Sequence, residues 1–250
     1  MTDAGFRPRV AVASLSGQSD AAWAREASGE AGLAFLGGVA LDEPTRTAAE
    51  RMAADRNRTE FLPADPVAFV ADELDALADA PIDAGVNVRS TAPGPVLPVA
   101  AVCAERDAIL EVNAHCRQSE MCAAGAGETL LRDTERLCAV VSAAADEGAT
   151  TSVKVRAEVP GVDLPGLARA LDDAGADVIH VDAMDSEGVV ASVREAFDGV
   201  LIANNGVRDR ATVREYLAYG ADAVSIGRPS DNPRVRARVR DAVAEWFDDA

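Results

Sequence analysis

Two side chains are the strongest candidates for chemistry: a single lysine, and a cysteine that follows a polar strand end. Lys154 is the only lysine in 250 residues, and every other basic residue is arginine. It lies in the β-branched run 151–156, which predicts a buried strand. An ammonium group is a compact charge whose pKa responds to burial and which can hydrogen-bond a flavin or a phosphate. A lone lysine in a buried strand therefore predicts a chemical role.

The stretch 110–131 contains the cysteine, and it is the most specific part of the chain. An expected strand ends at Asn113, a short loop presents Cys116, and the glycine pair Gly125 and Gly127 precedes the next helix. The other three cysteines fall on helical or packing positions, where we expect small, reduced, apolar side chains: Cys103, Cys122 and Cys138. Because no Cys-x-x-Cys pair occurs, we expect no zinc or iron–sulfur site and no other metal.

Short β-rich runs alternate with alanine-rich amphipathic stretches, which is typical of repeated βα units around a parallel sheet. The expected strands are 10–13, 33–36, 82–88, 109–112, 152–155, 178–181, 200–203 and 223–226. Eight units in this length predict a single-domain (β/α)8 TIM barrel over residues 1–250, with an enlarged second unit around 42–81. An open, doubly wound sheet is the alternative, but the Gly-x-Gly-x-x-Gly fingerprint after the first strand is missing.

Polar residues gather where the expected strands end, which in a barrel is the active-site face. They are Ser14, Asn87, Asn113, Lys154, His180, Asn204, Asn205, Gly227 and Arg228. The glycine-containing loops after the seventh and eighth strands are placed where barrels bind phosphate. We expect residues 232–250 to form a closing helix whose arginines face solvent, and His115 to be a surface residue.

The net charge is −18, spread along the chain without an acidic tail. This excludes a broadly basic surface for DNA and argues against anionic membranes as partners. Acidic residues throughout, with arginine favoured over lysine, predict a halophilic protein in a salt-rich cytoplasm, where basic RNA sites are also weakened. No apolar run approaches a membrane span, and the N-terminus lacks a signal-peptide core. We therefore expect a cytoplasmic protein.

The ordered motifs resemble the tRNA-dihydrouridine synthase family over nearly the whole chain. Asn113-Ala-His-Cys116 resembles its Asn-x-x-Cys loop, which is followed at the same spacing by Gly-x-Gly and Leu-Leu. Further similar positions are Ser14-Leu-Ser-Gly17, Lys154-Val-Arg156, His180, Asn205-Gly206, Gly227-Arg228 and Asn232-Pro233. The resemblance implies an FMN-dependent oxidoreductase acting on the C5–C6 double bond of a pyrimidine, namely uridine in tRNA, with NAD(P)H as the expected electron donor.

The resemblance also implies residue roles. In the family, hydride moves between flavin N5 and pyrimidine C6 while a loop cysteine protonates C5, so Cys116 would be the acid. Lys154 would lie at the N1 and O2 edge of the flavin, where a cation stabilises the reduced ring. The implied cofactor-binding residues are Ser14, Leu15, Ser16, Asn87 (in place of a family glutamine), Lys154, His180, Asn205, Gly206, Gly227 and Arg228. Asn113, catalytic together with Cys116, and Arg156 would contact the substrate.

Three departures from the family bear on the substrate. Arg117 replaces the proline after the loop cysteine, with Gln118, Ser119 and Glu120 in place of basic residues. Val181 and Asp182 follow His180, without the family's nearby arginine. We expect residues 232–250 to be the eighth and last helix, which would correspond to a short, archaeal-like relative that lacks the C-terminal tRNA-binding helical domain. These departures leave open a smaller pyrimidine, or tRNA bound with a partner protein.

Three alternatives therefore remain. The first is a dihydropyrimidine or dihydroorotate dehydrogenase-like enzyme acting on a free pyrimidine. The second is a flavin-free phosphate-binding barrel, a lyase or isomerase in which Lys154 acts as base or Schiff-base former. The third is a non-catalytic RNA-modification subunit that retains only the scaffold.

Overall fold

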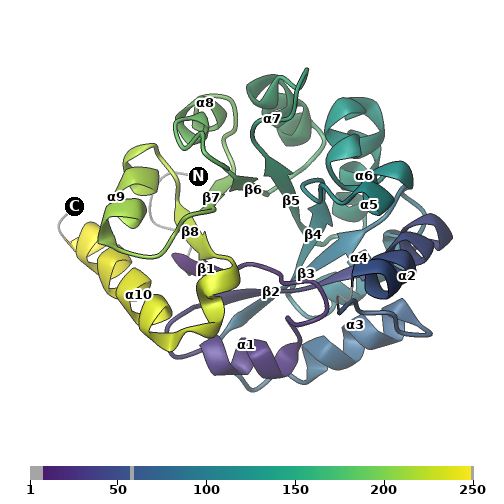
Figure 1. Cartoon of the computed structure of the whole chain (residues 1–250), viewed down its shortest axis with the longest axis horizontal. Helices are drawn as coiled ribbons and strands as arrows, with labels where there is room; N and C mark the ends of the chain where they lie inside the picture. The colour runs from purple at the N-terminus through teal and green to yellow at the C-terminus, as the bar shows by residue number, and fades with distance from the viewer. Residues whose placement is uncertain (1–7, 57–58, 249–250) are drawn as a thin grey trace.

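Eight parallel strands close into a barrel surrounded by helices in the computed structural model, which describes residues 8–56 and 59–248 (Figure 1). The strands are β1 Val10–Val12, β2 Leu33–Ala40, β3 Asp83–Arg89, β4 Ile109–Asn113, β5 Thr150–Arg156, β6 Val178–Asp182, β7 Val200–Asn204 and β8 Ala223–Ile226. Each strand pairs with the next, and β8 pairs with β1. The predicted (β/α)8 barrel is confirmed, and the open-sheet alternative is wrong.

The strands form a barrel because successive side chains point to opposite faces and both faces are covered. Outward residues such as Val112, Val153 and Val181 join the large apolar cluster beneath the helices. Inward residues near the amino ends of the strands form a second apolar cluster that includes Phe35 and Ile202. Toward the carboxyl ends the inward positions become polar. The interior of the barrel is therefore filled with apolar side chains at the amino ends of the strands and lined by polar side chains at their carboxyl ends.

The helices are α1 Ala21–Ala27, α2 Glu43–Arg56, α3 Pro66–Asp75, α4 Leu97–Ala104, α5 Ser119–Ala123, α6 Thr134–Asp146, α7 Leu164–Asp173, α8 Val189–Arg194, α9 Arg210–Ala218 and α10 Pro233–Asp248, with 3-10 turns η1 Gly127–Arg132 and η2 Arg228–Asp231. Several begin at an aspartate whose carboxylate accepts a backbone N–H of the first turn: Asp20, Asp65, Asp133, Asp163 and Asp209. Some of the dispersed acidic residues therefore serve as helix caps. No described helix is long and apolar enough to cross a membrane.

The segment expected to enlarge the second βα unit contains two helices, α2 and α3, between β2 and β3. The chain between them packs closely on the loop after β1. The approach is so close that a Cβ on Gly17 would lie 2.3 Å from the backbone of Thr59. From the same segment, Glu60 forms a buried ion pair of 2.7 Å with Arg89 at the end of β3. The insertion therefore supports the rim of the barrel next to β1 and β3.

Two expectations about element ends need correction. Asn87, Lys154 and His180 were expected at the ends of their strands, but each lies two residues before the end of β3, β5 or β6. The closing helix α10 is present, but one of its arginines is not solvated. Arg236 is buried and donates to the carbonyls of Ser230 and Glu26. These hydrogen bonds connect α10 to η2 and α1.

Candidate functional site

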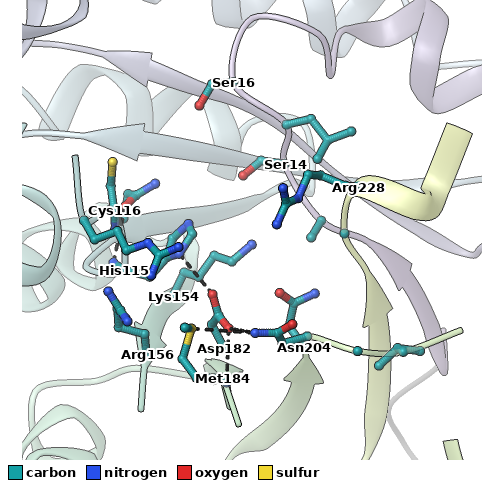
Figure 2. Close-up of a pocket in the computed structure, with 18 of the residues that line it drawn as sticks. Ser14, Ser16, His115, Cys116, Lys154, Arg156, Asp182, Met184, Asn204 and Arg228 are labelled. Carbon is teal, nitrogen blue, oxygen red and sulfur yellow. Dashed lines mark hydrogen bonds and ion pairs between the residues drawn. The ribbon is translucent and has the colours of Figure 1, made fainter. Parts of the chain in front are cut away.

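A cavity of about 760 Å³ opens at the carboxyl ends of the strands (Figure 2). Most residues expected to act in the site line it: Ser14, Leu15, Ser16, Asn113, Cys116, Lys154, Arg156, Asn205, Gly206, Gly227 and Arg228. The exceptions are Asn87 and His180. The cavity is within the size range of small-molecule sites. Residues at the carboxyl ends of every strand except β2 are thus brought to one place, as the barrel topology allows.

Lys154 is 2% exposed, and it lies in register between Asn113 of β4 and His180 of β6. Its ammonium has no hydrogen-bond partner among the described residues, and in Figure 2 the side chain extends between His115 and Arg228. Burial lowers the pKa of Lys154, although the carboxylates of Glu111 and Asp182 act in the opposite direction. A desolvated cation without a partner at the cavity wall is suited to an anionic or electron-rich ligand.

The Cys116 loop is held by a turn around Asn113. The side-chain oxygen of Asn113 accepts the backbone N–H of Cys116 at 3.1 Å and that of His115 at 3.3 Å. On the other side, Gly127 has a φ of +60°, and a Cβ there would lie 2.2 Å from the carbonyl oxygen of Cys116. Only glycine fits this close approach. The predicted Asn-x-x-Cys and Gly-x-Gly motifs therefore act together to place the thiol in the cavity wall.

Asn87 lies below the cavity, fully buried, and not in its wall as expected for a cofactor contact. Its oxygen accepts a hydrogen bond of 2.7 Å from Asn113, and its amide donates to Glu111 at 2.8 Å. All of its contacts are therefore internal, because the position lies one inward layer deeper than Asn113. In this structure Asn87 supports the turn that carries Cys116.

His180 is likewise fully buried beneath the cavity, at the centre of β6. Its Nδ1 lies 2.7 Å from Glu111 and its Nε2 lies 2.6 Å from the hydroxyl of Ser225. The amide of Asn204 donates to the same hydroxyl at 2.7 Å. A carboxylate only accepts, so Nδ1 carries the proton. The expected direct contact of His180 with flavin or phosphate is thus replaced here by internal hydrogen bonds.

The loops after β7 and β8 form the side of the cavity opposite Cys116. Asn205 and Gly206 have φ values of +88° and +68°, a conformation that favours glycine. Gly227 has a φ of −82°, and a Cβ there would meet only the amide of Asn204 at 4.0 Å. The space beside Gly227 is thus open toward the cavity. Arg228 is exposed and has no ion pair or hydrogen bond to any described residue, which leaves its guanidinium available for an anion.

His115 and Asp182 are among the cavity residues that were not expected from the sequence, together with Arg89, Met184 and Arg208. The expectation that His115 lies on the surface is wrong, since its Nδ1 is 3.5 Å from a carboxylate oxygen of Asp182 and its side chain is 27% exposed. Asp182 lies two residues after His180 on β6, and the period of two indicated that it faces inward. Nothing in the sequence indicated that the Cys116 loop would bring His115 to it.

The charges of this pair are set by their surroundings. Burial is the largest influence on His115 and, with the charge of Lys154, lowers its pKa to about 4. Burial raises the pKa of Asp182, but contacts with His115, Lys154 and Asn205 outweigh it and lower the pKa to about 2. At neutral pH the wall therefore carries a neutral imidazole beside an ionised carboxylate. Among the described residues no group of acidic, cysteine and histidine side chains is arranged to hold a metal ion.

Fold and site together define a (β/α)8 barrel whose polar cavity is lined by a thiol and by cations without a partner among the described residues, namely Lys154, Arg117 and Arg228. The profile of the dihydrouridine synthase (Dus) family matches residues 40–247. The chain belongs to this family. It is a flavin-dependent oxidoreductase of the dihydrouridine synthase type, with FMN as its cofactor.

An uncharacterized protein of Methanocaldococcus jannaschii is 25% identical over 232 residues, which cover 88% of each chain. Among solved structures, FabK from Thermotoga maritima superposes with a TM-score of 0.57 at 16% identity, over 91% of this chain and 58% of that one. A morphinone reductase variant in complex with tetrahydroNAD superposes with a TM-score of 0.61 at 17% identity, over 91% of this chain and 86% of that one. These structural similarities establish the fold.

Proposed function

We propose that this protein reduces the C5–C6 double bond of uridine in tRNA, with NAD(P)H as the electron donor and a salt-rich cytoplasm as its setting. The observation that carries the proposal is that Cys116 and Lys154 line the same cavity from neighbouring units of a dihydrouridine synthase barrel. The thiol is a proton donor and the ammonium a charge partner. Neither the lyase nor the non-catalytic alternative explains why both are retained.

The shape and charge of the cavity suit FMN. The open space beside Gly227 would be filled by any larger side chain. Arg228 supplies an unpartnered guanidinium at the same edge, which suits a phosphate group. Lys154 supplies a second unpartnered cation across the cavity, which suits the electron-rich edge of a flavin. When bound, FMN would supply hydride transfer.

The residues of this chain would divide the remaining work. Cys116 would hold the proton that the pyrimidine C5 receives, because the Asn113 turn and the approach of Gly127 fix the position of its loop. Arg156, held at 2.6 Å by Glu128, would bind the substrate from the cavity wall. Ser14, Leu15 and Ser16 would close the cofactor site on the β1 side. Asn87 and His180 would act through the residues above them.

The first experiment is to purify the protein at high salt and record its absorbance and the flavin released on denaturation. We expect one FMN per chain, and reduction of unmodified tRNA transcripts in the presence of NAD(P)H. Uridine monophosphate serves as the parallel substrate. Turnover of the mononucleotide alone would shift the proposal to a free pyrimidine, whereas a protein that cannot be loaded with FMN would contradict it.

A further inference from the structure

The His115–Asp182 pair joins the loop after β4 to the end of β6 across the cavity wall (Figure 2). Asp182 is fixed from several sides. One carboxylate oxygen accepts the amide of Asn205 at 2.9 Å and the backbone N–H of Met184 at 3.3 Å, while the other faces Nδ1 of His115. The backbone of His115 is fixed by Asn113, as described above. Both members are therefore held before any ligand arrives.

The second ring nitrogen of His115, Nε2, has no hydrogen-bond partner among the described residues. The ring lines the cavity and is partly exposed, and Nδ1 is already directed at Asp182. The groups whose charges act on the ring are Asp182, Lys154 and Glu111. Because Nδ1 lies 3.5 Å from a carboxylate, which only accepts hydrogen bonds, we expect Nδ1 to carry the proton of the neutral ring, which leaves Nε2 as an acceptor.

The acceptors beside His115 are already engaged, since one oxygen of Asp182 accepts from Asn205 and Met184 and the other faces His115. Lys154, Arg156 and Arg228 can only donate, and the side-chain oxygen of Asn113 already accepts two backbone N–H groups. A uracil ring presents one N–H donor, at N3, between two carbonyl oxygens that accept. The donors named above suit the carbonyl oxygens, and the ring N–H needs an acceptor beside them.

We infer that Nε2 of His115 accepts the N3–H of the substrate pyrimidine, and that Asp182 is the positioning residue that fixes the required tautomer. The inference rests on the proposed function and names its specificity contact. Burial lowers the pKa of His115 to about 4, which keeps the ring neutral and able to accept at pH 7. A cytosine ring, which has no N3–H, would place an acceptor against this nitrogen and be disfavoured.

The test compares two amides that reproduce opposite ends of the ring. The amide of His115→Gln reaches the Nε2 position, and that of His115→Asn reaches the Nδ1 position. We expect His115→Asn to raise KM for the tRNA about tenfold with kcat nearly unchanged, because one hydrogen bond is lost. His115→Gln should stay within about threefold, with equal FMN content in both. Equal KM effects, or no KM effect in either variant, would show that the pair only ties two loops together.

A second measurement does not depend on turnover. The chain has two histidines, His115 and His180, so nitrogen-15 spectra of histidine-labelled protein resolve both rings. We expect His115 as the Nδ1–H tautomer in the wild type and a mixture of tautomers in Asp182→Asn. An Nε2–H tautomer in the wild type would overturn the inference. If the holoenzyme reduced no pyrimidine while this tautomer was found, the proposed function would fail and the His115–Asp182 arrangement would stand.

Discussion

Glu111 and His180 meet inside the barrel at 2.7 Å, and neither side chain is exposed. Burial alone would raise the pKa of Glu111, but the contact with His180, the charge of Lys154 and the hydrogen bond from Asn87 together lower it. Burial and Lys154 lower the pKa of His180. The floor of the cavity thus contains an ionised carboxylate that balances Lys154 and aligns a neutral imidazole.

Glu111→Gln tests the importance of this floor. The amide keeps the shape but loses the charge that balances Lys154 and turns one acceptor into a donor. We expect the free energy of unfolding to fall by about 1–3 kcal/mol at pH 7. Glu195→Gln, at an exposed helix end, is the matched control and should change stability by less than about 0.5 kcal/mol. Equal losses in chemical denaturation would refute a special role for Glu111.

Gly227→Ala tests whether the open space at the β8 loop is kept for the cofactor. A Cβ there would meet no protein atom closer than 4.0 Å, so we expect the FMN-free variant to fold and its FMN affinity to be lowered at least tenfold. Gly94→Ala is the control, because that glycine is exposed with open space around it. Fluorescence titration with FMN gives both affinities. Unaltered FMN binding by Gly227→Ala would remove the β8 loop from the cofactor site.

Lys154→Met replaces the buried ammonium with an apolar side chain of similar length. Burial disfavours the ammonium, but its charge also stabilises the carboxylates of Glu111 and Asp182, so these effects oppose each other and we expect the FMN-free variant to remain folded. We expect weaker FMN binding and slower flavin reduction by NAD(P)H in stopped-flow absorbance. We expect Lys154→Arg to show the same two defects, because the guanidinium group is larger and planar. If the flavin in Lys154→Met were reduced at the wild-type rate, the lone lysine would have no role in the redox reaction.

The pH dependence of stability should reveal His115. Its folded pKa lies near 4, below the usual value of 6.5, so the unfolded chain binds more protons between these values. The free energy of unfolding should therefore fall as the pH drops from about 6.5 to 4. The pKa of His180 is also lowered in the folded protein, so its protonation contributes to the same loss of stability at low pH. The difference between the wild type and His115→Asn isolates His115, and we expect a flatter profile in the variant. Parallel profiles would mean that the ring titrates normally.

The sequence was sufficient for the fold because each strand carries an unbroken apolar face and the helices intervene regularly. It also located most of the cavity wall, since polar residues such as Lys154 and Asn205 mark the carboxyl ends of strands. The sequence did not show how far below the cavity an inward-facing side chain lies. Asn87 and His180 are polar and inward-facing, but one layer too low to reach the cavity. Contacts across the barrel, such as that of His115 with Asp182, depend on loop geometry that no local pattern encodes.

The most direct test of the proposed reaction is the dihydrouridine content of tRNA from a strain that lacks this gene. We predict that dihydrouridine is lost and is restored by the wild-type gene and by Cys122→Ala. We predict that it is not restored by Cys116→Ala, although the purified variant retains FMN. Cys122 is the matched control, because its thiol lies in the same segment and donates to the carbonyl of Cys116 at 3.5 Å. Unchanged dihydrouridine in the deletion strain, or full restoration by Cys116→Ala, would contradict the proposal.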